Sequence, residues 1–82
     1  MAARQVDEST LIALIEAGVV REAIITRVRN QGDHKWCIQI KYGLKTQVLR
    51  SKREPMRLFH TIDTAAKLLF ECGMYQMQID YS

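Results

Sequence analysis

Four basic side chains within eight positions are the residues of this chain most able to do chemistry. They are Arg50, Lys52, Arg53 and Arg57, and the only acid among them is Glu54. Guanidinium and ammonium groups bind phosphate oxygens, so such a cluster on a turn can position a nucleic acid. The alternative is a solvated turn in which Glu54 pairs with a neighbouring arginine. The residue types favour neither interpretation over the other.

The basic character extends upstream of this cluster. Residues 34–60 carry seven Lys or Arg and one acid, whereas five of the nine acids lie within residues 1–33. Because the net charge is only +3, the distribution of charge indicates more than the total does. The predicted nucleic-acid-binding residues are therefore the four of the cluster together with Lys35, Lys41 and Lys45. For these three lysines the alternative is an ordinary solvated sheet surface.

The histidines, cysteines and glycines form no catalytic or metal-binding pattern. His34 and His60 lack HxxxH or HxxE spacing, and Cys37 and Cys72 form no CxxC motif. The four glycines are scattered and make no phosphate-binding loop. We therefore expect no catalytic residue, no metal site, no cofactor and no enzymatic activity. Two reduced thiols are typical of a cytoplasmic protein, although a single disulfide is an open alternative.

The 82 residues are enough for one domain. We expect residues 1–6 to be a flexible N-terminus and residues 7–82 to form a single α+β domain. The apolar runs are too short to span a membrane, and the N-terminus lacks the apolar stretch of a signal peptide. A cytoplasmic location is the resulting expectation.

The first half of the chain reads as a helix followed by a strand and a turn. Asp7 or Ser9 can cap a short helix, and Gly18 is a natural stop. Residues 19–29 are rich in β-branched types and predict a strand. Residues 30–33 have the composition of a turn.

The middle of the chain predicts a second and a third strand. From His34 onward, apolar and polar residues alternate, with Trp36, Ile38, Ile40 and Tyr42 on one side and Lys35, Cys37, Gln39 and Lys41 on the other. Gly43 allows a tight reversal into a strand over 44–51, and Pro55 breaks the pattern. Residues 57–59 can add a short extended segment. Trp36 and Tyr42 share the phase of the isoleucines, so we expect them in the core rather than in a ligand pocket.

The last third predicts a capped helix and a closing strand. Thr61 is a good N-cap, Gly73 a good stop, and the apolar stripe between them is Ile62, Ala65, Ala66, Leu69 and Phe70. Tyr75, Met77, Ile79 and Tyr81 then alternate with polar residues. A strand that closes the chain can lie at a sheet edge and pair with a second copy, which predicts a homodimer through the C-terminal strand.

Burial requirements then give the architecture. The order is α-β-β-β-α-β, and a mostly antiparallel sheet with two helices packed on one face buries every apolar side. If all strands turn their apolar sides the same way, the other face is polar and carries Lys35, Gln39, Lys41, Lys45, Gln47, Gln76 and Gln78. That face lacks the paired aromatics on which single-stranded nucleic acid would stack.

One segment resembles a known family. It reads Leu49-x-x-x-Arg53-Glu54-Pro55-x-Arg57-x-Phe59-x-Thr61-x-Asp63-x-Ala65 and is followed by the helix, Gly73 and the closing strand. With Trp36 in the preceding strand, residues 34–80 resemble the partition-associated proteins of the ParC type found on plasmids and integrated conjugative elements. The family pattern has Gly where this chain has Glu54. The resemblance implies a small bacterial accessory protein of segregation or maintenance, and it supplies no catalytic residue.

Two functional hypotheses follow. The first is a non-enzymatic accessory protein of plasmid or mobile-element maintenance that binds double-stranded DNA through the basic turn, with weak sequence preference and strong salt dependence. The second is an interaction adaptor or dimerisation module whose partner is another maintenance protein. Neither hypothesis involves a membrane.

Overall fold

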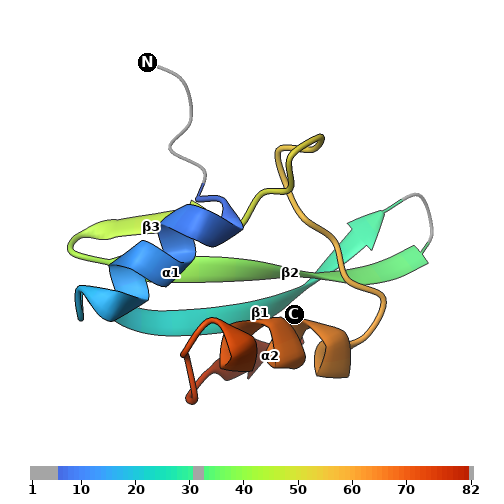
Figure 1. Ribbon diagram of the computed structural model, residues 1–82. Helices are drawn as coiled ribbons and strands as arrows, with labels where there is room; N and C mark the ends of the chain where they lie inside the picture. Colours follow the sequence, from blue (N-terminus) through green and yellow to red (C-terminus); the bar gives the residue numbers. More distant parts are fainter. Residues whose placement is uncertain (1–5, 31–32, 82) are drawn as a thin grey trace.

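The fold follows the expected order of helices and strands (Figure 1). The computed structural model describes residues 6–30 and 33–81, so part of the turn predicted at 30–33 and nearly all of the predicted flexible N-terminus lie outside the described residues. The elements are α1 (Glu8–Glu16), β1 (Val20–Asn30), β2 (Asp33–Tyr42), β3 (Lys45–Val48), α2 (Ile62–Glu71) and β4 (Gln78–Asp80). The predicted α-β-β-β-α-β order is confirmed.

The four strands form one sheet in the spatial order β3-β2-β1-β4. The β1–β2 and β2–β3 pairs are antiparallel, and β4 runs parallel to β1. The sheet is therefore mostly antiparallel, as predicted. β3 and β4 are its edge strands, and β4 has only three residues, because the stretch from Tyr75 to Met77 does not join the predicted closing strand.

Both helices lie on the same face of the sheet (Figure 1). Their ends have the predicted caps: Asp7 accepts from the Thr10 backbone N–H at 2.8 Å, and Thr61 accepts from that of Thr64 at 3.1 Å. Gly73 ends α2 with a φ of 103°, which glycine adopts without strain. The core between helices and sheet contains Val6, Leu11, Ala23, Ile25, Ile38, Ile40, Leu49, Phe59, Ala65, Leu68, Leu69 and Cys72.

The buried stripe of α2 differs from the predicted one. Ala65, Leu68, Leu69 and Cys72 are buried, whereas Phe70 is 62% exposed. The buried residues follow i, i+3, i+4, i+7 spacing, and Phe70 falls outside that series. The prediction that Phe70 faces the core was therefore wrong, because Leu68 and Cys72 complete the helical face.

The pairing register also corrects the predicted polar face. Lys45 lies opposite Tyr42 and Gln47 lies opposite Ile40. Directly opposed residues of an antiparallel pair share a face, so Lys45 and Gln47 are on the helix-covered side of the sheet. The two-residue connection between β2 and β3 sets this register, and Gly43 adopts the positive φ of 58° within it.

The uncovered face consequently takes Thr46 and Val48 of β3, together with Lys35, Gln39 and Lys41 of β2. Gln78 of β4 shares this face, as predicted, because it lies opposite Ile24. Gln76, which was expected there, precedes β4 and belongs to no strand.

The two cysteines are free and buried. Cys37 pairs with Thr26 on the uncovered face, whereas Cys72 is part of the core on the other side. The alternative of a disulfide between them is therefore wrong.

Aromatic residues of β2 line the border of the core. Trp36 and Tyr42 are partly buried against it, in agreement with their predicted core position. Trp36 also meets the ring of Tyr81 edge to face, with 5.5 Å between centroids. This contact ties the chain just after β4 to the central strand β2.

Candidate nucleic-acid interface

The basic cluster lies on a loop whose two ends both hydrogen-bond to β2. We call residues 50–57 the basic loop. Before it, Leu49 donates its backbone N–H to Ile38 of β2 at 2.8 Å. After it, Phe59 and Trp36 of β2 exchange two backbone hydrogen bonds of 2.8 and 2.9 Å, so of the extended segment predicted at 57–59 only Phe59 forms a bridge. The Arg57 N–H donates to the Leu49 carbonyl at 2.9 Å and closes the base of the loop.

The N-terminal segment supports the same base. Val6 donates its N–H to the Val48 carbonyl at 3.1 Å, and Arg50 donates to the Val6 carbonyl at 2.8 Å. Val6 is 1% exposed, so the ordered part of the chain includes a residue that we expected in the flexible N-terminus. Burial of this side chain brings the start of α1 against the basic loop.

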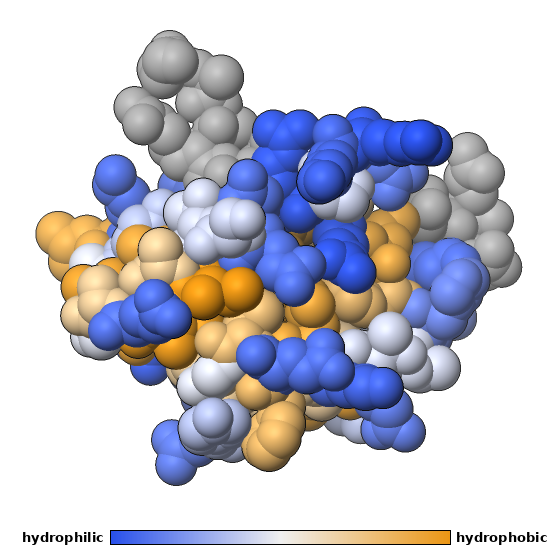
Figure 2. All heavy atoms as spheres, viewed as in Figure 1, coloured by the Kyte–Doolittle hydropathy of each residue, from blue (hydrophilic) through white to orange (hydrophobic). Residues whose placement is uncertain are grey.

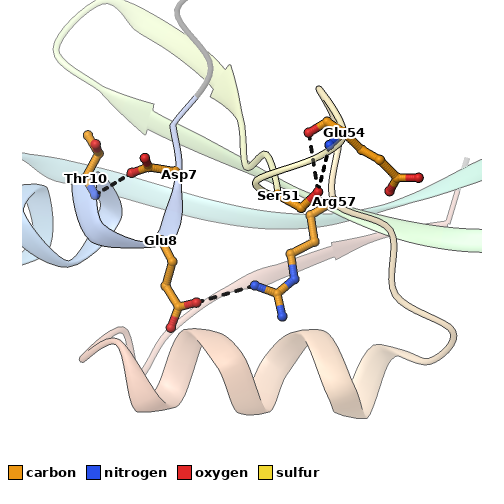
Figure 3. A network of polar contacts seen from close by, with 6 residues as sticks. All are labelled: Asp7, Glu8, Thr10, Ser51, Glu54 and Arg57. Carbon is orange, nitrogen blue, oxygen red and sulfur yellow. Dashed lines mark hydrogen bonds and ion pairs between the residues drawn. The ribbon is translucent and has the colours of Figure 1, made fainter.

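Inside the loop, Ser51 and Glu54 form a tight turn (Figure 3). The Glu54 N–H donates to Ser51 Oγ at 3.0 Å, and the Ser51 N–H donates to the Glu54 carbonyl at 3.1 Å. A serine hydroxyl that bonds to the backbone in this way stabilises a turn. The two residues between them, Lys52 and Arg53, are exposed at the tip, which projects as a hydrophilic region at the top of the view (Figure 2).

Arg57 is held from two sides. Its Nη1 lies 3.4 Å from Glu8 Oε1 (Figure 3). Its guanidinium carbon lies 5.2 Å from the centre of the Phe59 ring. The acid that pairs with the cluster is thus Glu8, from the first turn of α1, rather than Glu54. Both side chains of the pair are partly exposed, so the pair contributes at most about 1 kcal/mol.

Arg50 is half-buried, and its Nε donates to the Ser51 carbonyl at 3.1 Å. Together with the start of α1 it borders a groove of about 360 Å³, which is lined by Asp7, Glu8, Ser9, Ile12, Arg50, Ser51, Lys52 and Arg57. One wall of the groove is acidic and the other basic. The hydrogen bonds from Thr10 hold the pKa of Asp7 below its ordinary value, and the nearby charge of Arg50 acts in the same direction.

The three predicted lysines do not join the basic loop as a single surface. Lys35 Nζ lies 3.0 Å from Nδ1 of His60, just beyond the end of the loop. Lys41 is paired with Glu22 at 3.4 Å. Lys35 and Lys41 are six positions apart in β2, which is about 20 Å along a strand. Lys45 lies across the hairpin on the opposite face.

Residues 6–82 match the ParC-like family. The chain belongs to this family. The match extends the resemblance predicted for residues 34–80 to α1 and β1, and it indicates a role related to plasmid partition. No curated protein and no solved structure matches this ParC-like chain.

The described part of this ParC-like chain contains neither a membrane-spanning helix nor a cluster of metal ligands. None of its helices is long and apolar enough to cross a membrane. Over the same residues, no group of three or more His, Cys, Asp or Glu side chains is placed to hold a metal ion.

Sequence reasoning missed two residues of the site. Ser51 could have been found from the sequence, because serine is a common turn residue whose hydroxyl accepts from a nearby backbone N–H. Glu8 could not, because it lies 49 positions from Arg57 and only the fold brings them together.

Proposed function

We propose that this ParC-like chain is a non-enzymatic, cytoplasmic accessory protein of plasmid or mobile-element maintenance, and that it contacts the phosphates of double-stranded DNA through the basic loop. The observation that carries the proposal is the exposure of Lys52 and Arg53 at the tip of a loop braced by its own hydrogen bonds. Such bracing lowers the entropy lost when the loop binds, because its backbone is already ordered.

The predicted residues should contribute unequally to DNA binding. Lys52 and Arg53 are the leading phosphate contacts. Arg50 and Arg57 flank them, but each already bonds within the protein, so their contribution is smaller. Lys35 lies near the end of the loop and can extend the contact along a DNA strand. Lys41 of β2 and Lys45 of β3 lie at the far end of the β2–β3 hairpin and would contact DNA only if it crossed the sheet.

The expected binding is electrostatic and depends little on sequence, because phosphates carry no base information. Each phosphate contact releases counterions and adds about 0.9 to the slope of log K against log salt concentration. Replacing Lys52 and Arg53 together with alanine should lower that slope by about 2 and weaken binding to every duplex alike.

A matched control removes the same charge elsewhere. Arg27 and Lys67 are both exposed, lie outside the basic loop and belong to none of the predicted contacts. The double variant Arg27→Ala, Lys67→Ala should keep most of the wild-type slope. Equal losses for the two double variants would show that only net charge matters, and the assignment of the loop would be wrong.

A second candidate function is an adaptor that binds another maintenance protein. It is favoured by Phe70 and Tyr75 near the end of α2, which are 62% and 69% exposed. Their ring centroids lie 4.9 Å apart. Exposed aromatic pairs are typical anchors of protein interfaces. Under this function, binding to the partner should respond little to salt and should weaken at least tenfold in Tyr75→Ala, while the Lys52, Arg53 variant leaves it unchanged.

A further inference from the structure

Among the described residues, no strand pairs with the outer edge of β4, so another strand can add there. β4 is the last strand of the sheet next to β1, and its three residues are all exposed. An edge strand directs part of its backbone N–H and C=O groups outward, where they can hydrogen-bond to a further strand. The same edge is apolar in part, because Ile79 and Tyr81 are 37% and 59% exposed.

This edge is also held in place. The pairing of Ile79 with Ile25 of β1 fixes one side of β4, and the edge-to-face contact between Tyr81 and Trp36 fixes the residue that follows the strand. A partner strand therefore meets an ordered template, which reduces the entropic cost of association.

We propose that the occupant of this edge is a second copy of the chain, paired antiparallel through β4 around a two-fold axis at Ile79. The two sheets then join into one continuous sheet of eight strands. This inference is independent of the proposed DNA binding.

The order of side chains in β4 favours this register. With the axis at Ile79, the two Ile79 side chains meet on the helix-covered face. On the uncovered face Gln78 of each copy lies opposite Asp80 of the other. An amide N–H can donate to a carboxylate, which accepts several hydrogen bonds at once. An axis at Asp80 would instead oppose two carboxylates, which is destabilising.

A two-fold arrangement makes every contact twice and leaves β4 of neither copy open, so the assembly stops at two chains. It also leaves both basic loops free, because each loop returns to the outer edge of β2, on the side of the sheet away from β4. The dimer therefore doubles the number of basic loops without covering either.

The test is the molar mass in solution over a concentration series, measured by light scattering after size exclusion. The wild type should reach twice the 9.5 kDa of one chain. Ile79→Asp places two carboxylates at the axis and should abolish the dimer. Because Ile79 also touches its own chain, the thermal transition of this variant is measured alongside.

Two substitutions at Gln78, which is exposed, keep the test valid should Ile79→Asp unfold. Gln78→Lys creates two ion pairs with Asp80 and should tighten the dimer about tenfold, whereas Gln78→Glu opposes like charges and should weaken it by a similar factor. Gln47→Lys and Gln47→Glu make the same changes on the opposite edge strand and should leave the dimer unaffected. A wild type that stays monomeric, or a dimer that ignores both Gln78 variants, overturns the proposal.

Discussion

Arg57 and Glu8 lie 49 positions apart in sequence and form an ion pair with 3.4 Å between Nη1 and Oε1. The pair joins the first turn of α1 to the end of the basic loop (Figure 3). An arginine that is paired in this way is positioned by the protein but is also partly neutralised. Glu8 therefore competes with any phosphate that approaches Arg57.

This competition predicts that Glu8→Gln binds duplex DNA more tightly. An exposed ion pair is worth about 0.2 to 1 kcal/mol, so its removal should raise affinity by a factor of about 1.4 to 5 at low salt. The control is Glu16→Gln, which makes the same charge change at the exposed end of α1. Fluorescence anisotropy with a labelled duplex gives both affinities. If Glu16→Gln strengthens binding as much as Glu8→Gln, the effect comes from net charge and the competition is refuted.

The turn inside the basic loop predicts a role for the Ser51 hydroxyl. Ser51→Ala removes the acceptor of the Glu54 N–H, which should destabilise the loop by about 1 kcal/mol. Trypsin cleaves after Lys and Arg, so cleavage at Lys52 and Arg53 should become severalfold faster. Ser51→Thr keeps the hydroxyl and should retain the wild-type rate. An unchanged rate in Ser51→Ala would mean that the hydroxyl does not brace the loop.

The cap of α1 predicts a pH dependence of stability. Hydrogen bonds lower the pKa of Asp7 in the folded state, so its stabilising effect is present above the unfolded pKa and is lost as pH falls through the folded one. Asp7→Asn keeps a side chain that caps helices well but cannot titrate there. Chemical denaturation from neutral pH downward should therefore show a flatter acid limb for Asp7→Asn. Identical acid limbs in the two proteins would contradict this.

The buried thiols predict slow modification. Burial raises the pKa of Cys37. Burial is also the main cause that raises the pKa of Cys72, and the negative charges of Glu8 and Glu71 add to it. The thiolate is the reactive form, so a thiol reagent at neutral pH should label both cysteines slowly in the native protein and rapidly in denaturant. The thiols are kept protonated in the fold, so stability should decline as pH rises from the unfolded pKa toward the folded one. Rapid labelling of Cys37 in the native protein would contradict this and show that the structure around this buried thiol opens readily.

The sequence predicted those parts of the fold that depend on local patterns. The caps at Asp7 and Thr61, the stop at Gly73 and the alternation from Trp36 to Tyr42 each depend on neighbouring residues, and all are present. The face of Lys45 was mispredicted because it depends on the strand register, which the two-residue hairpin determines.

The candidate site could be predicted only in part. The clustering of Lys52 and Arg53 is visible in the sequence because the two residues are adjacent. Their separation from Lys41 depends on the position of Lys41 near the far end of β2, and the pairing of Arg57 with Glu8 depends on how α1 docks. Contacts between distant segments leave no periodic signal in a single chain.

If DNA binds at the tip of the basic loop, the backbone of that tip must respond to an added duplex. The most direct test is an NMR titration of the isotope-labelled protein with a short duplex at low salt, followed by the addition of salt. Binding at the tip should shift the backbone amide signals of Lys52 and Arg53 most and those around Lys45 little, and salt should reverse the changes. Shifts centred on another surface, or none at low salt, would contradict it.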